Sequence, residues 1–140
     1  MSGNTSQTRA DIIRQFLPRS PYVGHLGIKL IDMYTDVATL RLPFANSLIT
    51  IGTTIHGGAI ASLIDTAAMV AAWADDSVPD NLRGTTVSLT VTYLAPAEHE
   101  DIQATARVLQ RGRNLVFLDV EVQSISRKTI ARGLVTYKLG

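Results

Sequence analysis

A single carboxylate lies in the middle of a long apolar stretch of this sequence. Between His56 and Asp75 the only ionisable side chain is that of Asp65, and Leu63 and Ile64 precede it directly. A buried carboxylate without a partner costs several kcal/mol, so its presence there needs an explanation. Partly withdrawn from water, Asp65 could act as a general base toward water or as a nucleophile toward an acyl carbon.

A second group that could do chemistry lies nine residues earlier, where His56, Gly57 and Gly58 open the apolar stretch. The start of a helix offers backbone N–H groups without partners and the positive end of the helix dipole. Glycines there let a ligand oxygen come close, which is one way to build an oxyanion hole. Such a helix start and a carboxylate together are suited to hydrolysis by acyl transfer.

The spacing of these two groups predicts that they belong to different chains. Nine residues advance about 13.5 Å along a helix and turn through roughly 900°, which leaves His56 and Asp65 half a turn out of phase. One chain cannot direct both side chains at the same atom. If they serve a common site, the helix start of one chain must face Asp65 of another across a two-fold axis, which gives two equivalent sites per dimer.

Two helices are expected around these residues. Apolar residues at helical spacing predict a short helix over residues 11–17, which Pro18 ends. Gly57 and Gly58 open a longer helix that closes at residues 75–79. Because this helix is apolar nearly all round, a sheet must cover it on most sides to remove its surface from water.

The rest of the chain has the two-residue period of β-strands. Residues 27–44 predict a hairpin, and residues 86–93 alternate so that Val87, Leu89, Val91 and Tyr93 share one face. Short connections predict that the remaining strands, at residues 101–110, 114–124 and 129–138, are antiparallel neighbours. The predicted fold class is α+β, an antiparallel sheet curled around a central helix.

Composition excludes several classes of function. The chain has 140 residues, enough for one domain, of which 46% are hydrophobic and 18% charged. Thirteen Lys and Arg residues balance twelve Asp and Glu, so nucleic acid is not an expected partner. The sequence has no cysteine, which suits a cytoplasmic location. Residues 1–10 do not form a signal peptide, and the charge of Asp65 argues against a membrane span over residues 57–74.

The motifs resemble those of the PaaI-type acyl-CoA thioesterases of the hotdog-fold superfamily. The similarity rests on His56-Gly57-Gly58 with Asp65 nine positions after the histidine, and on the strand end Thr92-Tyr93-Leu94-Ala95-Pro96. It covers residues 20–140, after a tail and short helix at residues 1–19. The resemblance implies a five- or six-stranded antiparallel sheet wrapped around a long helix, assembled as a dimer and often as a tetramer.

The resemblance also implies roles for individual residues. Gly57 would polarise the thioester carbonyl through its N–H, His56 would orient or help to polarise it, and Asp65 of the partner chain would act as base or nucleophile. Thr86 would hold water or the carboxylate. CoA, which belongs to the substrate, would contact Gly58 and the turn Gly112-Arg113. No metal ion and no bound cofactor are implied.

One position departs from the family pattern. Many members carry an Asn or Gln six residues before the histidine, where this chain has Thr50, and Asn46 lies ten residues before it. Either Asn46 replaces that amide as a catalytic residue, or the enzyme works without it. Apolar lining by Ile60, Leu63, Trp73 and Phe44 would suit medium-chain or aromatic acyl groups.

Two alternatives remain open at this point. A hydratase of the same fold would carry an Asp and a His a few residues apart at the helix start, which this sequence lacks. A module that binds acyl-CoA without turnover is the non-enzymatic alternative. Among the other polar groups, residues 98–101 are expected to form a solvated turn, His25 is expected to be structural, and Ser62 lacks the G-x-S-x-G context of an esterase nucleophile.

Overall fold

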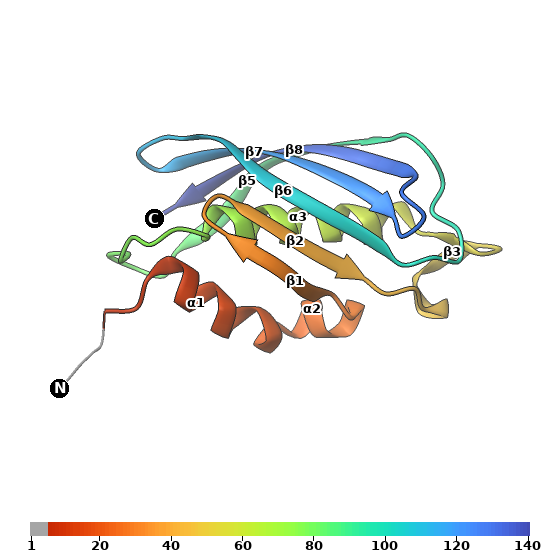
Figure 1. Ribbon diagram of the computed structural model, residues 1–140, viewed down its shortest axis with the longest axis horizontal. Coiled ribbons are helices and arrows are strands. Elements are labelled where there is room, and N and C mark those ends of the chain that lie inside the picture. The colour runs from red at the N-terminus through yellow and green to blue at the C-terminus, as the bar shows by residue number, and fades with distance from the viewer. Residues whose placement is uncertain (1–5) are drawn as a thin grey trace.

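The computed structural model describes residues 6–140, which form a curved sheet around one long helix (Figure 1). The helices are α1 (Arg9–Phe16), α2 (Pro21–Leu26) and α3 (Gly57–Ala72), with 3₁₀ turns at Leu17–Arg19 and Asn46–Leu48. The strands are β1 (Lys29–Tyr34), β2 (Val37–Leu42), β3 (Ile49–Ile51), β4 (Thr54–Ile55), β5 (Gly84–Tyr93), β6 (Ile102–Arg111), β7 (Leu115–Ser124) and β8 (Thr129–Leu139). The predicted α+β class is confirmed.

The main sheet has six antiparallel strands in the order β1-β2-β6-β7-β8-β5. Tight turns join β1 to β2, β6 to β7 and β7 to β8, whereas β2 and β6 pair although they are far apart in the sequence. β5 follows α3 and pairs with the last strand. The sheet therefore ends in β1 on one side and β5 on the other. The predicted strands β6, β7 and β8 agree with the structure to within one residue at each end.

α3 is held in the concave face of the sheet by nearly continuous apolar contact. Its side chains Leu63, Ile64, Ala67 and Val70 are fully buried, and each large one stabilises the fold by about 1.5–3 kcal/mol. At Gly133 in β8, a Cβ atom would lie only 2.6 Å from Ile64 Cγ2. The absence of a side chain at this position therefore lets α3 approach the sheet closely.

The predicted uninterrupted alternation of β5 is wrong at one residue. Thr86 pairs with Tyr137 and Ser88 with Thr136, so Val87 is an extra residue that has no place in the ladder. The shift changes which side chains share a face. Thr86 lies on the helix side of the sheet together with Leu89, Val91 and Tyr93, because their partners in β8 line that side, whereas strict alternation would have put Thr86 on the other face.

The N-terminal helix α1 packs against the same core as the sheet. Ile13 and Leu17 are buried in that core, and Thr8 caps the helix by accepting a hydrogen bond from the Asp11 N–H. The helix therefore begins two residues before its predicted start. α1 and α2 lie beside β1, across the open side of the curved sheet (Figure 1).

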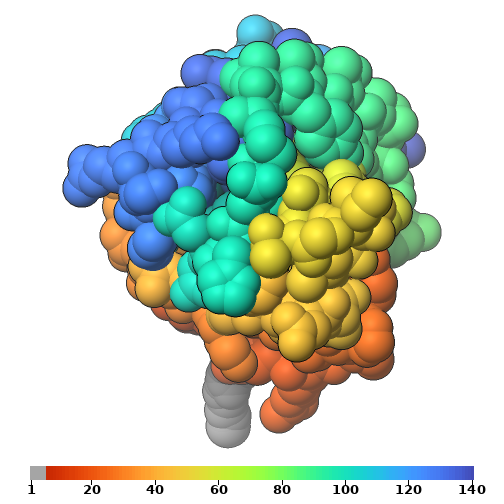
Figure 2. Space-filling model, turned by 90° about the vertical axis from the view of Figure 1, so that its right-hand side faces the viewer, coloured from red at the N-terminus to blue at the C-terminus, as the bar shows by residue number. Residues whose placement is uncertain are grey.

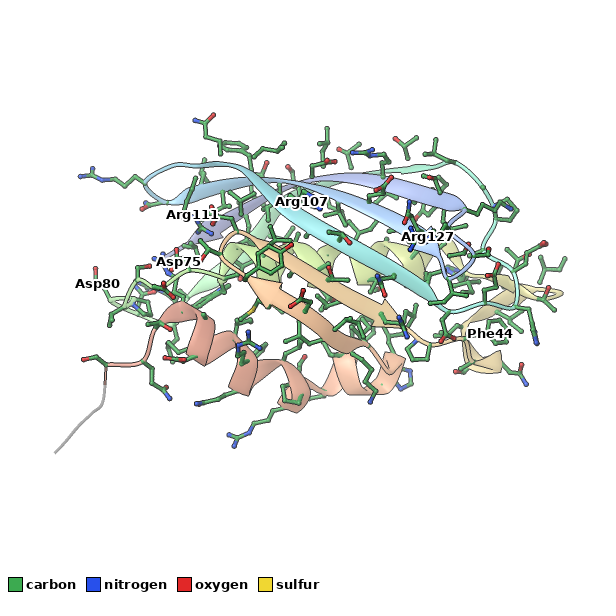
Figure 3. The ribbon with its side chains drawn as sticks, in the orientation of Figure 1. Phe44, Asp75, Asp80, Arg107, Arg111 and Arg127 are labelled. Atoms are coloured by element: carbon green, nitrogen blue, oxygen red, sulfur yellow. The ribbon has the colours of Figure 1, made fainter. Side chains whose placement is uncertain are left out.

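A cluster of charged groups ties α1 to the end of α3. Arg9 lies 3.2 Å and Arg111 3.3 Å from the same Asp75 carboxylate oxygen, and Figure 3 shows Asp75 and Arg111 at the same end of the molecule. Burial raises the pKa of Asp75, but hydrogen bonds from Ser77 and the charges of Arg111 and Arg9 outweigh burial and lower that pKa below its usual range. Arg111 also donates to the Ala72 carbonyl at 2.9 Å, which places a positive charge at the C-terminal end of α3.

Two small elements were not predicted from the sequence. α2 ends at Gly27, whose φ of 81° suits a residue without Cβ. The β3–β4 hairpin precedes α3 and bonds to the segment after β5, through Ile55 N–H to the Ala97 carbonyl and His99 N–H to the Thr53 carbonyl. Figure 2 shows these segments side by side, in yellow and teal. No helix within residues 6–140 is long and apolar enough to cross a membrane.

Candidate active site

The start of α3 leaves one backbone N–H available to a ligand. The Gly58 N–H donates to His56 Nδ1 at 2.7 Å, and the N–H groups of Ala59 and Ile60 donate to the His56 carbonyl. Within the part of the chain that the structure describes, the N–H of Gly57 has no partner. Gly57 is therefore the donor that the helix start can offer to an oxyanion.

The hydrogen bond from Gly58 also fixes the state of the His56 ring. A neutral imidazole whose Nδ1 accepts a hydrogen bond carries its proton on Nε2. His56 is exposed and anchored through its own N–H, which donates to the Leu48 carbonyl at 2.7 Å. Its Nε2–H is thus a second donor at the start of α3, in addition to the Gly57 N–H. A Cβ at Gly58 would lie 2.9 Å from His56 Nδ1, so this glycine makes room for the ring.

Tyr93, at the end of β5, holds the same helix start from the other side. Its hydroxyl donates to the Gly57 carbonyl at 2.8 Å. A Cβ at Gly57 would lie 3.3 Å from the tyrosine ring, so the ring rests directly on the glycine. In the sequence, Tyr93 is recognisable only as a marker of the strand end. Its position as the last residue of an alternating strand gives no indication that it contacts the helix.

Asp65 lies in the middle of α3 and is bound by Thr86, the contact that the family resemblance implies for this threonine. Thr86 Oγ1 donates to Asp65 Oδ1 at 2.6 Å. Among the described residues no cation pairs with Asp65, so its second oxygen can accept a proton from water or attack a carbonyl carbon. The two side chains meet because the extra residue at Val87 turns Thr86 toward the helix.

Asp65 belongs to a stripe of α3 that the sheet leaves uncovered. Five residues of α3 are partly or fully exposed and follow each other at helical spacing, so they lie on one face of the helix. We call them the accessible stripe: Gly58, Ala61, Ser62, Asp65 and Met69. Ser62 donates to the Gly58 carbonyl and bonds to the Tyr22 hydroxyl, so its own hydroxyl is engaged. Since α3 is continuous from Gly57 to Ala72, Gly57 and Asp65 lie about 12 Å apart along its axis.

The remaining predicted site residues lie on other elements than Asp65. Asn46 begins the 3₁₀ turn before β3 and Thr50 lies in β3; both are exposed, and neither side chain has a hydrogen-bond partner among residues 6–140. The turn Gly112-Arg113 follows β6 near the C-terminal end of α3. There Arg113 lines a recess of about 450 Å³ together with Arg9 and Arg83. The catalytic role of Asn46 and the CoA-contact role of Gly112 and Arg113 stay predictions.

Comparison with known families identifies the superfamily of the chain. The family model of the thioesterase superfamily matches residues 52–131, more than half of the chain, and this range includes His56, Asp65 and Thr86. The chain belongs to the thioesterase superfamily. Membership in this superfamily confirms the predicted class of enzyme, a thioester hydrolase.

Individual members of the thioesterase superfamily are similar to this chain over different lengths. The chain is 36% identical to human acyl-coenzyme A thioesterase 13 over 89 residues, 62% of this chain and 61% of the human protein. It is 29% identical to the medium/long-chain acyl-CoA thioesterase YigI of Escherichia coli over 140 aligned positions, 89% of each protein. The PaaI protein of Escherichia coli superposes with a TM-score of 0.81 at 22% identity, covering 97% of this chain and 96% of PaaI. The predicted hotdog fold is thereby confirmed.

Proposed function

We propose that this chain hydrolyses acyl-CoA thioesters at a site shared between two copies of the chain. The observation that carries the proposal is the arrangement on α3, where one unpaired N–H at Gly57 and one hydroxyl-held carboxylate at Asp65 lie two helical turns apart within the described residues. The names of the similar acyl-CoA thioesterases support CoA as the thiol part of the substrate.

Two features of the chain support a dimer. β5 is an edge strand of ten residues without a charged side chain or a proline, and proteins rarely leave such an edge uncovered. In addition, if Gly57 of one chain lies opposite Asp65 of the other on antiparallel helices, the two-fold axis passes beside residue 61, halfway between them. Residue 61 is an alanine on the accessible stripe, small enough for close approach of the two helices.

In the proposed reaction the thioester carbonyl oxygen accepts hydrogen bonds from the Gly57 N–H and from His56 Nε2–H. Asp65 of the other chain takes a proton from water while the water oxygen attacks the carbonyl carbon, or attacks that carbon itself. The negative charge that develops on the carbonyl oxygen is stabilised by the two donors. The C–S bond then breaks, and CoA leaves as a thiolate that takes up the proton removed from water. If Asp65 itself attacked, water then hydrolyses the acyl-Asp65 anhydride, which releases the carboxylic acid and restores the carboxylate. Thr86 keeps one Asp65 oxygen occupied, so the other oxygen reacts.

The test of a shared site uses two inactive variants in one dimer. Gly57→Pro removes the N–H and adds the proline ring, whose Cβ lies against Tyr93 as the methyl group of an alanine would. Proline is tolerated at the first helical position, and His56 already has the extended backbone (ψ of 133°) that a residue before proline needs. Asp65→Asn removes the base. Each homodimer should release almost no CoA thiol from a panel of acyl-CoAs. A heterodimer purified through two tags should regain about half of the wild-type kcat, because one of its two sites is intact.

The controls separate the parts of the proposal. Gly57→Ala keeps the N–H and adds only a methyl group against Tyr93, so it should lose less activity than Gly57→Pro. A heterodimer as inactive as its parents would show that the site is not shared. A wild-type chain that binds acyl-CoA in calorimetry without releasing thiol would instead support the non-catalytic binding module.

A further inference from the structure

An apolar pocket lies beside the Asp65–Thr86 pair, between α1, α3 and the start of β5. Its volume is about 290 Å³, and its lining includes Ile12, Phe16, Met69, Trp73, Leu82 and Tyr137. We refer to it as the α1 pocket. α1 forms its outer wall, and the Asp75 cluster holds α1 in place through Arg9.

Three observations connect the α1 pocket to the carboxylate. Met69 follows Asp65 by one helical turn on the accessible stripe. Tyr137 is the cross-strand partner of Thr86. Burial raises the pKa of the Tyr137 hydroxyl, and its hydrogen bond with Trp73 lowers that pKa. The negative charge of Asp65 also raises the pKa of Tyr137, so the carboxylate lies close to this residue of the pocket wall. A group bound at Asp65 can therefore extend directly into the pocket.

We propose that the α1 pocket receives the acyl group of the thioester and that α1 sets the preferred chain length. This inference rests on the proposed function, since it names the substrate class of the same site. An apolar cavity of about 150 Å³ holds one benzene molecule. The α1 pocket has about twice that volume, which suits acyl chains of roughly 8 to 12 carbons or an arylacyl group at the same packing.

The chemistry of the lining decides which end of the substrate enters. Of the polar groups of the wall, Trp73 Nε1–H donates to the Tyr137 hydroxyl oxygen at 3.1 Å, so of these two groups only the Tyr137 O–H is left to bind a ligand. The pantetheine arm of CoA carries two amide groups, which would lose their hydrogen bonds to water in such a pocket. An alkyl or aryl group loses none. The opposite orientation would place pantetheine in the α1 pocket and the phosphates in the recess beside Arg113.

The experiment measures kcat/KM for acyl-CoAs from butanoyl to hexadecanoyl. Phe16→Ser removes an apolar side chain that is 49% exposed and so should not unfold the protein. The substitution should lower kcat/KM for decanoyl-CoA by about tenfold or more. It should leave kcat/KM for butanoyl-CoA within about twofold of the wild-type value. Ile12→Trp, which fills the pocket, should produce the same pattern more strongly. Phe117→Ser is the matched control, because Phe117 is 39% exposed on β7 and does not line the pocket. Its kcat/KM for every acyl-CoA should equal that of the wild type.

Each other outcome contradicts the inference in a distinct way. An equal loss for every chain length, with a raised KM, would show that the pocket binds pantetheine. Unchanged profiles in both Phe16→Ser and Ile12→Trp would show that the pocket is not used. Both results differ from failure of the proposed function, in which the wild type itself would hydrolyse no acyl-CoA at any chain length.

Discussion

At the scale of single residues, two hydroxyl groups on β5 hold the two halves of the site. Thr86 donates to the Asp65 carboxylate near the start of the strand, and Tyr93 donates to the Gly57 carbonyl at its end. Neither hydroxyl needs to touch the substrate to affect the reaction. Each fixes the position of a group that contacts the substrate in the proposed reaction.

Removal of the Thr86 hydroxyl should lower the rate without weakening substrate binding. In Thr86→Val the carboxylate loses a hydrogen bond to a charged group, worth about 1.5–3 kcal/mol, so we expect kcat to fall roughly 10- to 100-fold. Steady-state kinetics would show this with KM nearly unchanged. Thr86→Ser keeps the hydroxyl and should retain most of the activity; an equally inactive serine variant would contradict this role.

Tyr93 should act as a positioning residue for the helix start. Tyr93→Phe keeps the ring against Gly57 and loses one neutral hydrogen bond, so kcat should fall by about three- to tenfold at an unchanged KM. A purely structural role would instead lower the melting temperature and leave kcat of the folded fraction intact. Thermal unfolding measured beside the kinetics distinguishes the two.

The sequence revealed the candidate reactive residues more readily than the residues that hold them. Asp65 could be found because a carboxylate in an apolar helix is unusual, and Gly57 because glycines at a helix start are suited to bind an oxygen. The contact of Tyr93 with Gly57 could not be found, because it joins residues 36 positions apart through the packing of the strand end on the helix. Thr86 was assigned by family resemblance; strict alternation would have turned it away.

At the scale of elements, α1 depends on the Asp75 cluster for its position. Asp75 accepts hydrogen bonds from Arg9 and Ser77 and lies beside Arg111, so three segments of the chain meet at one carboxylate. The same contacts place the wall of the α1 pocket. Loss of the carboxylate should therefore affect both stability and the pocket.

Asp75→Asn should lower the free energy of unfolding by about 1–3 kcal/mol at neutral pH. The pKa of Asp75 is lowered from its ordinary value of 3.8, so the charged carboxylate stabilises the fold above that pH. The contribution is lost as the pH falls through the folded-state pKa. Urea unfolding from about pH 7 down to about pH 2.5 should show the wild type and the variant converging below the ordinary pKa; a constant difference would contradict the assignment.

Long elements were predictable and short ones were not. α3 and strands β6 to β8 carry enough periodic apolar residues to identify them. The ends of these strands are predicted to within one residue, whereas α3 ends at Ala72, before the predicted close at residues 75–79. α2 and the β3–β4 hairpin have only two to six residues in each element, and contacts to Leu48 and Ala97 rather than local pattern hold that hairpin region in place. Periodicity needs several turns or alternations to be recognised, and these segments are too short to provide them.

At the scale of the whole molecule, the uncovered side of α3 and the uncharged edge of β5 lie next to each other. A second copy that covers one would cover the other, and the proposed shared site requires the same arrangement. The spacing of His56 and Asp65 in the sequence already indicates two chains. The position of the proposed dimer axis, however, depends on α3 being one unbroken helix with Ala61 on its accessible stripe, which spacing alone does not establish.

Ala61→Arg should therefore prevent formation of the proposed dimer and, as a consequence, abolish thioesterase activity. Two arginines facing each other across the axis would clash and repel, so light scattering should report a monomer that remains folded by circular dichroism. Thr35→Arg, in the exposed β1–β2 turn, is the control and should change neither property. An Ala61→Arg variant that stays dimeric and active would contradict the proposed axis.

The extra residue in β5 lets one strand hold both the start and the middle of α3. Thr86 and Tyr93 are seven residues apart, so in a regular strand their side chains would lie on opposite faces. Both contact the helix because Val87 is an extra residue that reverses the alternation between them. A strand one residue shorter could keep either contact but not both. A substitution elsewhere in β5 that keeps its length therefore leaves both contacts in register. A change in the length of β5 would break the contact of Thr86 with Asp65 or that of Tyr93 with Gly57.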